Sequence, residues 1–248
     1  MTGAACSDRQ KRFWRPRSAA ENYRAALEAE HADDRRDAVT RIAESGYVTS
    51  DDAFGVLDAV ARTDPADQVR CVALRALARY DDERPIGTLL AVLQAGPDAR
   101  EKALPAGQDV RREAAAALAE LHRKNRLPAE DQPTAGALFV QLAERTSPRD
   151  LRIIALRALG GFQDRRVFAP LVQALRESDF ALADAAERAL MALTGRTFDY
   201  DPEAWERWLA AAEHPFEHAG EKVVSTRPAG PTWWDRERAR WQRAFKRD

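Results

Sequence analysis

One short pattern recurs along the chain, and this repetition constrains the fold more than any other feature. In each copy an apolar anchor residue is followed directly by Arg, and then by Ala, Ala and Leu at four, seven and eight positions after the anchor. The copies begin at Val69, Val110 and Leu151; a fourth, at Leu182, has Ala in place of Arg, and a degenerate first copy begins at position 35. The anchors are 34, 41, 41 and 31 residues apart. Such a period is typical of helical units that bury their apolar faces against their neighbours.

The residues around each copy predict a pair of helices. Apolar residues recur at helical spacing almost throughout, and no stretch has the sustained alternation of a half-buried strand. Ser18 with Glu21 indicates a capping box at a helix start, and Gly46 and Pro65 end two helices. The fold class is therefore predicted to be all-α. The expected pairs are 18–30 with 34–45, 50–62 with 67–80, 85–94 with 109–122, 134–145 with 149–160, and 165–176 with 179–193.

A V-R-x-x-A-x-x-A-L helix that follows a shorter amphipathic helix resembles the HEAT repeat, especially the short bacterial form named for phycobilisome lyases. The resemblance covers residues 18–212 and implies an α-α superhelix, a solenoid of five helix pairs. The segment Thr194–Trp208 resembles the aromatic ending that follows the last repeat of many bacterial HEAT proteins, which implies a helix capping the open end. The expected cap residues are Phe198, Tyr200, Trp205 and Trp208.

The remaining segments differ from the repeats in composition. Residues 1–17 are a basic tail, 213–231 predict an extended linker, 232–248 predict a basic amphipathic helix, and the insertion at 95–108 predicts a projecting loop. The net charge of −1 divides into +4 over residues 1–20, +3 over residues 232–248 and −8 between them. The last segment places three aromatic residues on one helical stripe, suited to docking on protein, either the chain itself or a partner, or on an anionic membrane surface. Acidic residues within this segment favour protein. The stripe consists of Trp234, Trp241 and Phe245.

Few residues have the types and spacings that chemistry requires. His214, Glu217 and His218 match the H-x-x-E-H pattern of zinc proteases, but Pro215 interrupts it and no third ligand is evident, so no metal is predicted. The chain has no Gly-rich phosphate loop, no G-x-S-x-G, C-x-x-C or H-E-x-x-H motif, and only two Cys. We therefore expect a protein that is not an enzyme, with no cofactor and no small-molecule substrate.

Two columns of arginine emerge when the copies are aligned. The HEAT resemblance implies that the Arg of the motif forms a structural ladder with acidic groups of neighbouring repeats. This column consists of Arg36, Arg70, Arg111 and Arg152. A second column lies five positions later, and the resemblance implies that it points into a concave groove, where guanidinium groups bind carboxylate or phosphate at two points. It consists of Arg41, Arg75, Arg157 and Arg188, and is interrupted by Ala116. The alternative is a solvated helix face that Asp37, Asp184 and Glu187 partly neutralise.

Together these features predict a non-enzymatic scaffold that binds a protein or peptide partner along its concave face. One alternative is a lyase-type or enzyme-associated HEAT protein. A second is binding to nucleic acid or a membrane surface through the basic tails, although the acidic middle disfavours nucleic acid.

The sequence also bears on the location of the protein. No apolar run is long enough to span a membrane and the first 20 residues lack an apolar leader, so the chain as written is expected to be cytoplasmic. Small residues before Cys6 resemble a lipoprotein cleavage site. An envelope-anchored lipoprotein is therefore the alternative if the true start lies upstream of Met1.

Overall fold

The structure is a computed structural model that describes residues 17–95, 103–221 and 224–225. Over these residues the chain has eleven α-helices, one short 3-10 helix and two strands of two residues each. This confirms the all-α fold class. Cys6, most of the basic N-terminal tail and the C-terminal stripe of Trp234, Trp241 and Phe245 lie outside the described residues.

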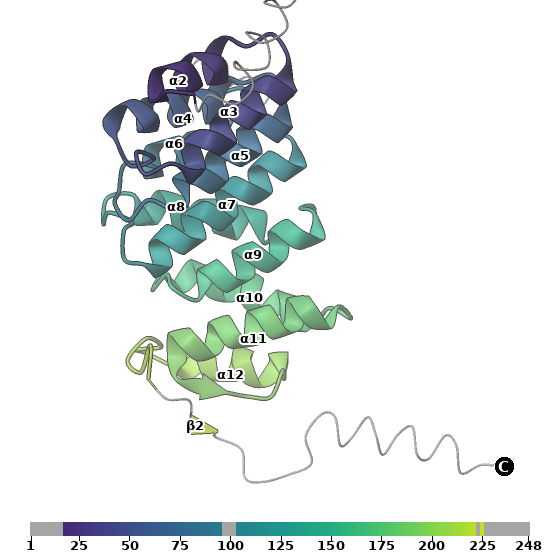
Figure 1. The fold of residues 1–248 in the computed structure, drawn as a ribbon. Coiled ribbons are helices and arrows are strands. Elements are labelled where there is room, and N and C mark those ends of the chain that lie inside the picture. The colour runs from purple at the N-terminus through teal and green to yellow at the C-terminus, as the bar shows by residue number, and fades with distance from the viewer. Residues whose placement is uncertain (1–16, 96–102, 222–223, 226–248) are drawn as a thin grey trace, which may run out of the picture. The chain divides into compact units, whose positions relative to one another are not determined.

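The helices follow one another in pairs that are joined by turns (Figure 1). Their limits lie within three residues of those predicted from the sequence. The elements are α2 (Ala19–Glu28), α3 (Ala32–Glu44), α4 (Asp51–Thr63), α5 (Asp67–Leu77), α6 (Ile86–Gln94), α7 (Gln108–Arg123), α8 (Gln132–Leu142), α9 (Arg149–Leu159), η1 (Arg165–Val167), α10 (Phe168–Leu175), α11 (Phe180–Thr194), β1 (Arg196–Thr197), α12 (Pro202–Ala211) and β2 (Val224–Ser225).

Local side-chain chemistry sets several of these limits. The predicted capping box is present at α2, where Ser18 Oγ accepts a hydrogen bond from the backbone N–H of Glu21 and the Glu21 carboxylate accepts one from the backbone N–H of Ser18. Asp201 likewise caps α12 by accepting from the N–H of Ala204. At its other end, α11 stops at Gly195, whose φ of 65° lies in the left-handed region that favours glycine.

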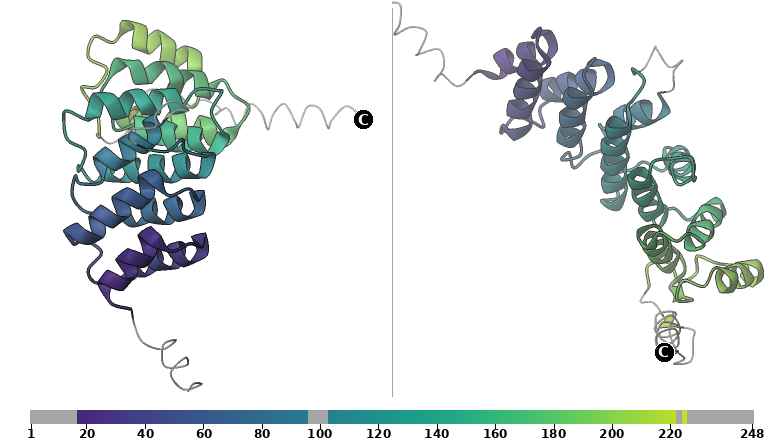
Figure 2. Two further views of the ribbon diagram at one scale, coloured as in Figure 1. Left: turned by 90° about the horizontal axis from the view of Figure 1, so that it is seen from above. Right: turned by 90° about the vertical axis from the view of Figure 1, so that its right-hand side faces the viewer.

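The chain divides into two compact units. Unit 1 comprises Met1–Tyr80 and Gly87–Ala114, and unit 2 comprises Asp81–Ile86 and Ala115–Asp248, so α7 contributes residues to both. In unit 1, α2 packs on α3 and α4 on α5, and these pairs contact each other through α2 with α4 and α3 with α5. In unit 2, α8 packs on α9 and α10 on α11, while α11 also contacts α9 and α12 contacts α10. The paired helices of each unit can be followed in Figure 2.

The repeated motif supplies core positions in both units. Val69, Ala73 and Leu77 of α5 are fully buried, and so are the matching Leu151 and Leu159 of α9. Burying one such large aliphatic side chain contributes about 1.5–3 kcal/mol relative to leaving it exposed. The small Ala residues of the motif let the neighbouring helix approach closely. The larger Val and Leu residues fill the space that remains between the two helices.

Residues 213–221, which the sequence assigned to the linker, form turns that pack on unit 2. The Phe216 ring stacks on Phe168 with centroids 5.2 Å apart, and the N–H of Gly220 donates to the carbonyl of Ala192. Beyond these turns, β2 pairs in parallel with β1. Packing therefore continues beyond residue 212, because Phe216 makes an apolar contact with unit 2. The Pro and Gly residues of this stretch had led the sequence analysis to predict an extended linker.

Candidate functional site on the second helices of the pairs

In the described part of the chain, three arginines are buried where consecutive helix pairs meet within a unit. Arg35 binds both carboxylate oxygens of Asp64, at 2.6 and 3.0 Å, and donates to the carbonyls of Ala29 and Glu30 at the end of α2. Arg152 pairs with Glu177 and donates to the carbonyl of Ala143 at the end of α8. Each guanidinium thus joins the carboxyl end of one first helix to the turn of the following pair, where a positive charge is favoured.

Arg70 makes the same kind of connection without an acidic partner in hydrogen-bond contact. Its guanidinium donates to the carbonyl of Ala61 in the last turn of α4, and to those of Leu104 and Pro105 before α7. The N–H of Leu104 also donates to the carbonyl of Arg62 at 2.8 Å. The end of the 95–108 insertion is therefore held against α4 rather than projecting as predicted, while residues 96–102 lie outside the described residues.

Of the four arginines in the predicted ladder, only Arg152 is buried and pairs with an acidic group of the next helix pair, whereas Arg70 is buried but binds carbonyls and the other two do not take the buried position. Arg36 has a side chain 39% exposed and pairs with Asp33 on its own helix, while its neighbour Arg35 takes the buried position. Consecutive helical residues point about 100° apart, so only one of the two can face the core. Arg111 is half-buried, and its guanidinium makes no hydrogen bond among the described residues.

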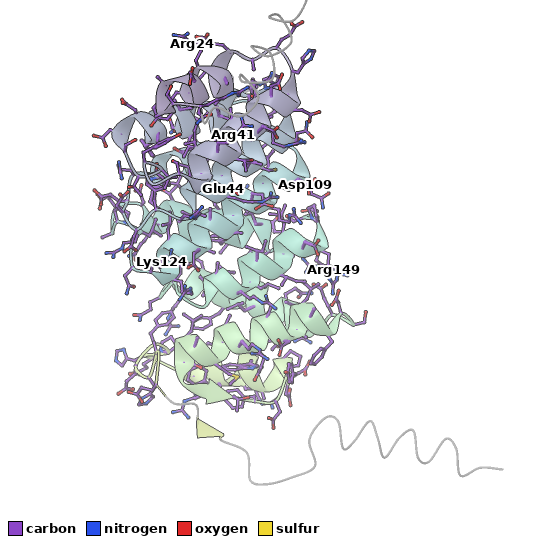
Figure 3. All side chains as sticks on the ribbon, in the orientation of Figure 1. Arg24, Arg41, Glu44, Asp109, Lys124 and Arg149 are labelled. Carbon is purple, nitrogen blue, oxygen red and sulfur yellow. The ribbon has the colours of Figure 1, made fainter. Side chains whose placement is uncertain are left out.

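The second column lies on exposed faces of the second helices, with Arg41 on α3 labelled in Figure 3. Arg75 pairs with Glu113 at 2.8 Å and Arg188 with Asp184 at 2.9 Å. Within the described residues, neither Arg41 nor Arg157 has an acidic partner at ion-pair distance. Part of the column is therefore neutralised, but of the three acidic residues that the solvated-face alternative named, only Asp184 pairs with it among the described residues. Arg41 and Arg157 keep their charge without an acidic partner in this part of the chain.

Arg157 lines a groove of about 670 Å³ in unit 2, between the second half of α7 and the end of α9. Small residues line much of this groove, and Ile154 adds an apolar contact. These small residues are Ala116, Ala119, Ala158, Gly160 and Gly161. Ala116 stands where the other copies have the second-column arginine. Its short side chain leaves space in the groove that an arginine side chain would occupy.

Two glycines in this groove permit close approaches. A Cβ atom on Gly161 would lie 2.6 Å from Nε2 of His122, and one on Gly160 would lie 3.0 Å from Cα of Ala189. Both distances are shorter than normal carbon contacts, so a side chain at either position would displace its neighbour. The sequence indicated only that this Gly pair ends a helix.

His122 and Arg123 line the same groove, and the sequence analysis did not single them out. The His122 ring stacks on Phe162 with centroids 4.1 Å apart. Burial lowers the pKa of His122 below its ordinary value, and a hydrogen bond with the Gly161 backbone opposes this shift in part. Because Glu120 binds Arg123 with two hydrogen bonds of 2.6 and 2.8 Å, Arg157 carries most of the available positive charge.

The aromatic segment after α11 packs where the cap was predicted. Trp205 is fully buried, and its ring meets Phe198 edge-to-face at 4.8 Å and Trp208 at 6.0 Å. Phe198 and Trp208 are partly exposed. Tyr200 is also partly exposed, and its hydroxyl donates to Asp184. The aromatic rings thus serve packing in unit 2.

The same aromatic segment also encloses a carboxylate, which the sequence analysis placed on the exposed face. Glu187 is 2% exposed and accepts hydrogen bonds from Trp205 Nε1 at 2.8 Å and Thr197 Oγ1 at 2.6 Å. Backbone N–H groups of Phe198 and Tyr200 also bind it. Burial raises the pKa of Glu187, although these hydrogen bonds oppose the shift. Glu187 therefore connects α11 to the aromatic segment that follows it.

The H-x-x-E-H segment has no metal-site geometry in the described residues. His218 Nδ1 lies 3.1 Å from the Glu221 carboxylate, and no group of three His, Cys, Asp or Glu side chains there is arranged to hold a metal ion. Cys71 is buried in α5. None of the helices in this part of the chain is long and apolar enough to cross a membrane.

Similarity to known proteins adds no assignment to this geometry. A comparison with models of known protein families finds no match, and a comparison with curated protein sequences finds no significant relative. The function must therefore be inferred from the residues themselves, and the arginine-lined α7–α9 groove is the site that they support best.

Proposed function

We propose that the chain is a non-enzymatic HEAT-like scaffold whose second helices bind an acidic segment of a protein or peptide partner. Its helix pairs would stack as an α-α superhelix with α12 as the cap. The packed neighbouring pairs support this arrangement, and the observation that carries the function is the α7–α9 groove, in which Arg157 has no acidic partner among the described residues.

The chemistry of the groove favours recognition of a carboxylate on an extended chain. The planar guanidinium of Arg157 binds a carboxylate through two parallel hydrogen bonds, while Ile154 and the small residues accept apolar parts of the segment. Arg188 lies on α11, which packs against α9. Its side chain is exposed in the pair with Asp184, and exposed ion pairs are weak, so a peptide carboxylate can compete for this guanidinium. Packed helices are about 8–10 Å apart, and an extended chain rises about 3.3 Å per residue, so acidic residues spaced by about three positions match adjacent second helices.

A binding titration tests this proposal with defined probes. The full chain is titrated with a fluorescent peptide that has Glu at every third position and with a matched peptide in which each Glu is Gln, and anisotropy is recorded. We expect the Glu peptide to bind more tightly, and Arg157→Glu to weaken its affinity about tenfold or more, because a charge-assisted hydrogen bond contributes about 1.5–3 kcal/mol.

The matched control is Arg145→Glu, which reverses an exposed arginine between α8 and α9 that does not line the groove. Equal losses from the two variants would show that the peptide responds only to overall charge. Preferential binding of duplex DNA, weakening steeply with salt, would instead favour the nucleic-acid alternative.

A further inference from the structure

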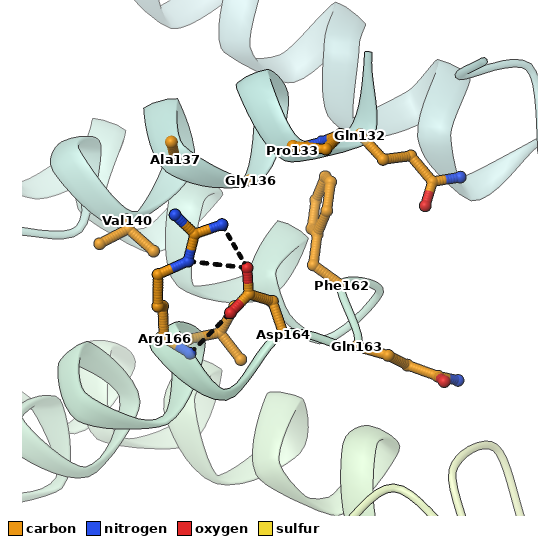
Figure 4. Close-up of a pocket in the computed structure, with 10 residues that line it drawn as sticks. Gln132, Pro133, Gly136, Ala137, Val140, Phe162, Gln163, Asp164 and Arg166 are labelled. Carbon is orange, nitrogen blue, oxygen red and sulfur yellow. Dashed lines mark hydrogen bonds and ion pairs between the residues drawn. The ribbon is translucent and has the colours of Figure 1, made fainter. Parts of the chain in front are cut away.

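A second cavity of about 300 Å³ lies on another face of unit 2, between the first half of α8 and the turn that leads through η1 into α10. Figure 4 shows its wall, with the Phe162 ring facing Gly136. Pro133, Val140 and Val167 add apolar surface. The cavity uses different residues from the α7–α9 groove and has no part in the function proposed above.

Its composition suits an aromatic side chain with one polar edge. Phe162 is held by the rings of His122 and Phe139, so its orientation is fixed before any ligand enters. Arg166 lies over the same cavity, fixed by hydrogen bonds to Asp164, and provides a cation for an aromatic face. The side-chain amide of Gln163 at the rim can accept a hydrogen bond from an indole N–H.

The C-terminal part of the chain starts close to this cavity. Arg165, beside Arg166 in η1, donates to the carbonyls of Ala212 and Glu213 at 2.7 and 2.8 Å. In a helix pair, the start of the first helix and the end of the second lie at the same end. The start of α8, the turn before α10 and the β1–β2 pair after α11 therefore share one end of the unit 2 pairs.

Chain length and charge both allow the C-terminal segment to return to this end. Trp234 follows Ser225 by nine residues, which can span about 30 Å when extended, whereas one helix pair occupies about 20 Å. The turns near Arg165 are acidic at the surface, with Glu213, Glu217 and Glu221 exposed. Residues 232–248 carry a charge of +3, so the two surfaces are complementary.

We propose that the C-terminal segment docks on its own unit 2, with the Trp234 side chain in the cavity between α8 and η1. The indole packs against Phe162 and beneath Arg166, and the basic residues that follow face the acidic turns. In the helix that the sequence predicts for residues 232–248, Trp233 would project about 100° away from Trp234 and so could not enter the cavity with it. The C-terminal segment thereby acts as a ligand of the chain that carries it.

Hydrogen exchange of the full-length chain tests this contact. We expect amides of residues 235–245 to be protected, and Trp234→Ala and Ala137→Trp each to accelerate their exchange about tenfold or more, by removing the ligand or by filling the cavity. The matched controls are Trp233→Ala and Thr134→Trp; Thr134 is exposed on α8 but does not line the cavity, so neither change should have this effect.

Three outcomes would overturn the proposal. The first is exchange of residues 235–245 at the rate of an unstructured peptide in the parent chain, or an equal effect of all four variants. The second is protection that disappears on dilution, because it would assign the contact to a second copy. The third is protection that arises only after phosphatidylserine vesicles are added, which would make the segment a membrane-surface helix.

Discussion

The first and last helix pairs of the chain bury ionisable groups of opposite charge. In the first pair, the buried Arg35 binds Asp64 of the following pair. In the last pair, Ala183 replaces the arginine of the motif, and Glu187 lies buried one turn later, bound by Trp205 and Thr197. An arginine thus connects a pair to another pair, whereas a carboxylate connects the last pair to the aromatic segment and α12 that follow it. The first pair is followed by another helix pair and the last pair by the aromatic segment, and this difference accounts for the different charge that each one buries.

The largest effect is expected when Trp205, the hydrogen-bond donor to the buried Glu187 carboxylate, is replaced. Trp205→Ala should lower the free energy of unfolding by about 3–5 kcal/mol, as expected for truncation of a buried aromatic residue. Loss of the indole N–H should add about 1–3 kcal/mol, because the Glu187 carboxylate loses a donor. Urea unfolding followed by circular dichroism measures the change. Trp205→Phe retains much of the packing without the donor, and a loss equal to that of Trp205→Ala would show that the hydrogen bond dominates.

The next test concerns the first pair. Arg35→Ala leaves the buried Asp64 without its partner and should cost about 3–5 kcal/mol in unfolding free energy. Arg36→Ala removes only an exposed contact with Asp33 and should cost less than about 1 kcal/mol. Thermal unfolding of the two variants checks the register of the degenerate first copy. A larger effect at Arg36 would restore the alignment predicted from the sequence.

The smallest expected effect is a change of unfolding free energy with pH, which should arise from Glu187 and not from Arg35. The pKa of Glu187 is raised in the folded chain, so its stabilising contribution is complete below the ordinary glutamate pKa of about 4.3 and is lost as the pH rises through the folded value. Glu187→Gln should remove this component. Unfolding free energies of both proteins at several pH values between 4 and 8 give the comparison, and parallel curves would contradict the role of Glu187 ionisation.

Helix limits were predictable because their signals are local. Capping residues such as Ser18 and Asp201 act within three positions of the backbone groups that they bind, and the motif places its apolar residues in the core. The first copy was misaligned because Arg35 and Arg36 are adjacent and the copy lacks the Leu that fixes the phase elsewhere. A pattern of residue types could not decide between them.

The candidate site was less predictable, because it depends on contacts between distant residues. The packing of the His122 ring against Gly161 joins positions 39 apart and has no local signature. Glu187 did leave a signal that the sequence analysis did not use: it occupies the position of the motif where Leu74 and Leu156 are fully buried. A charged residue at a core position of a repeat should have indicated a buried group with a partner of its own.

The three hydrogen bonds of Arg70 have a consequence for how this chain can change over time. They fix the end of the 95–108 insertion to α4 through the carbonyls of Leu104 and Pro105, independently of the residues that precede these two. The closure entropy of a segment between two fixed points rises slowly with its length, by about 0.6 kcal/mol for each doubling. Insertions into the 96–102 interval should therefore be tolerated in evolution, and the same interval offers protein engineers a place for an epitope or reporter peptide.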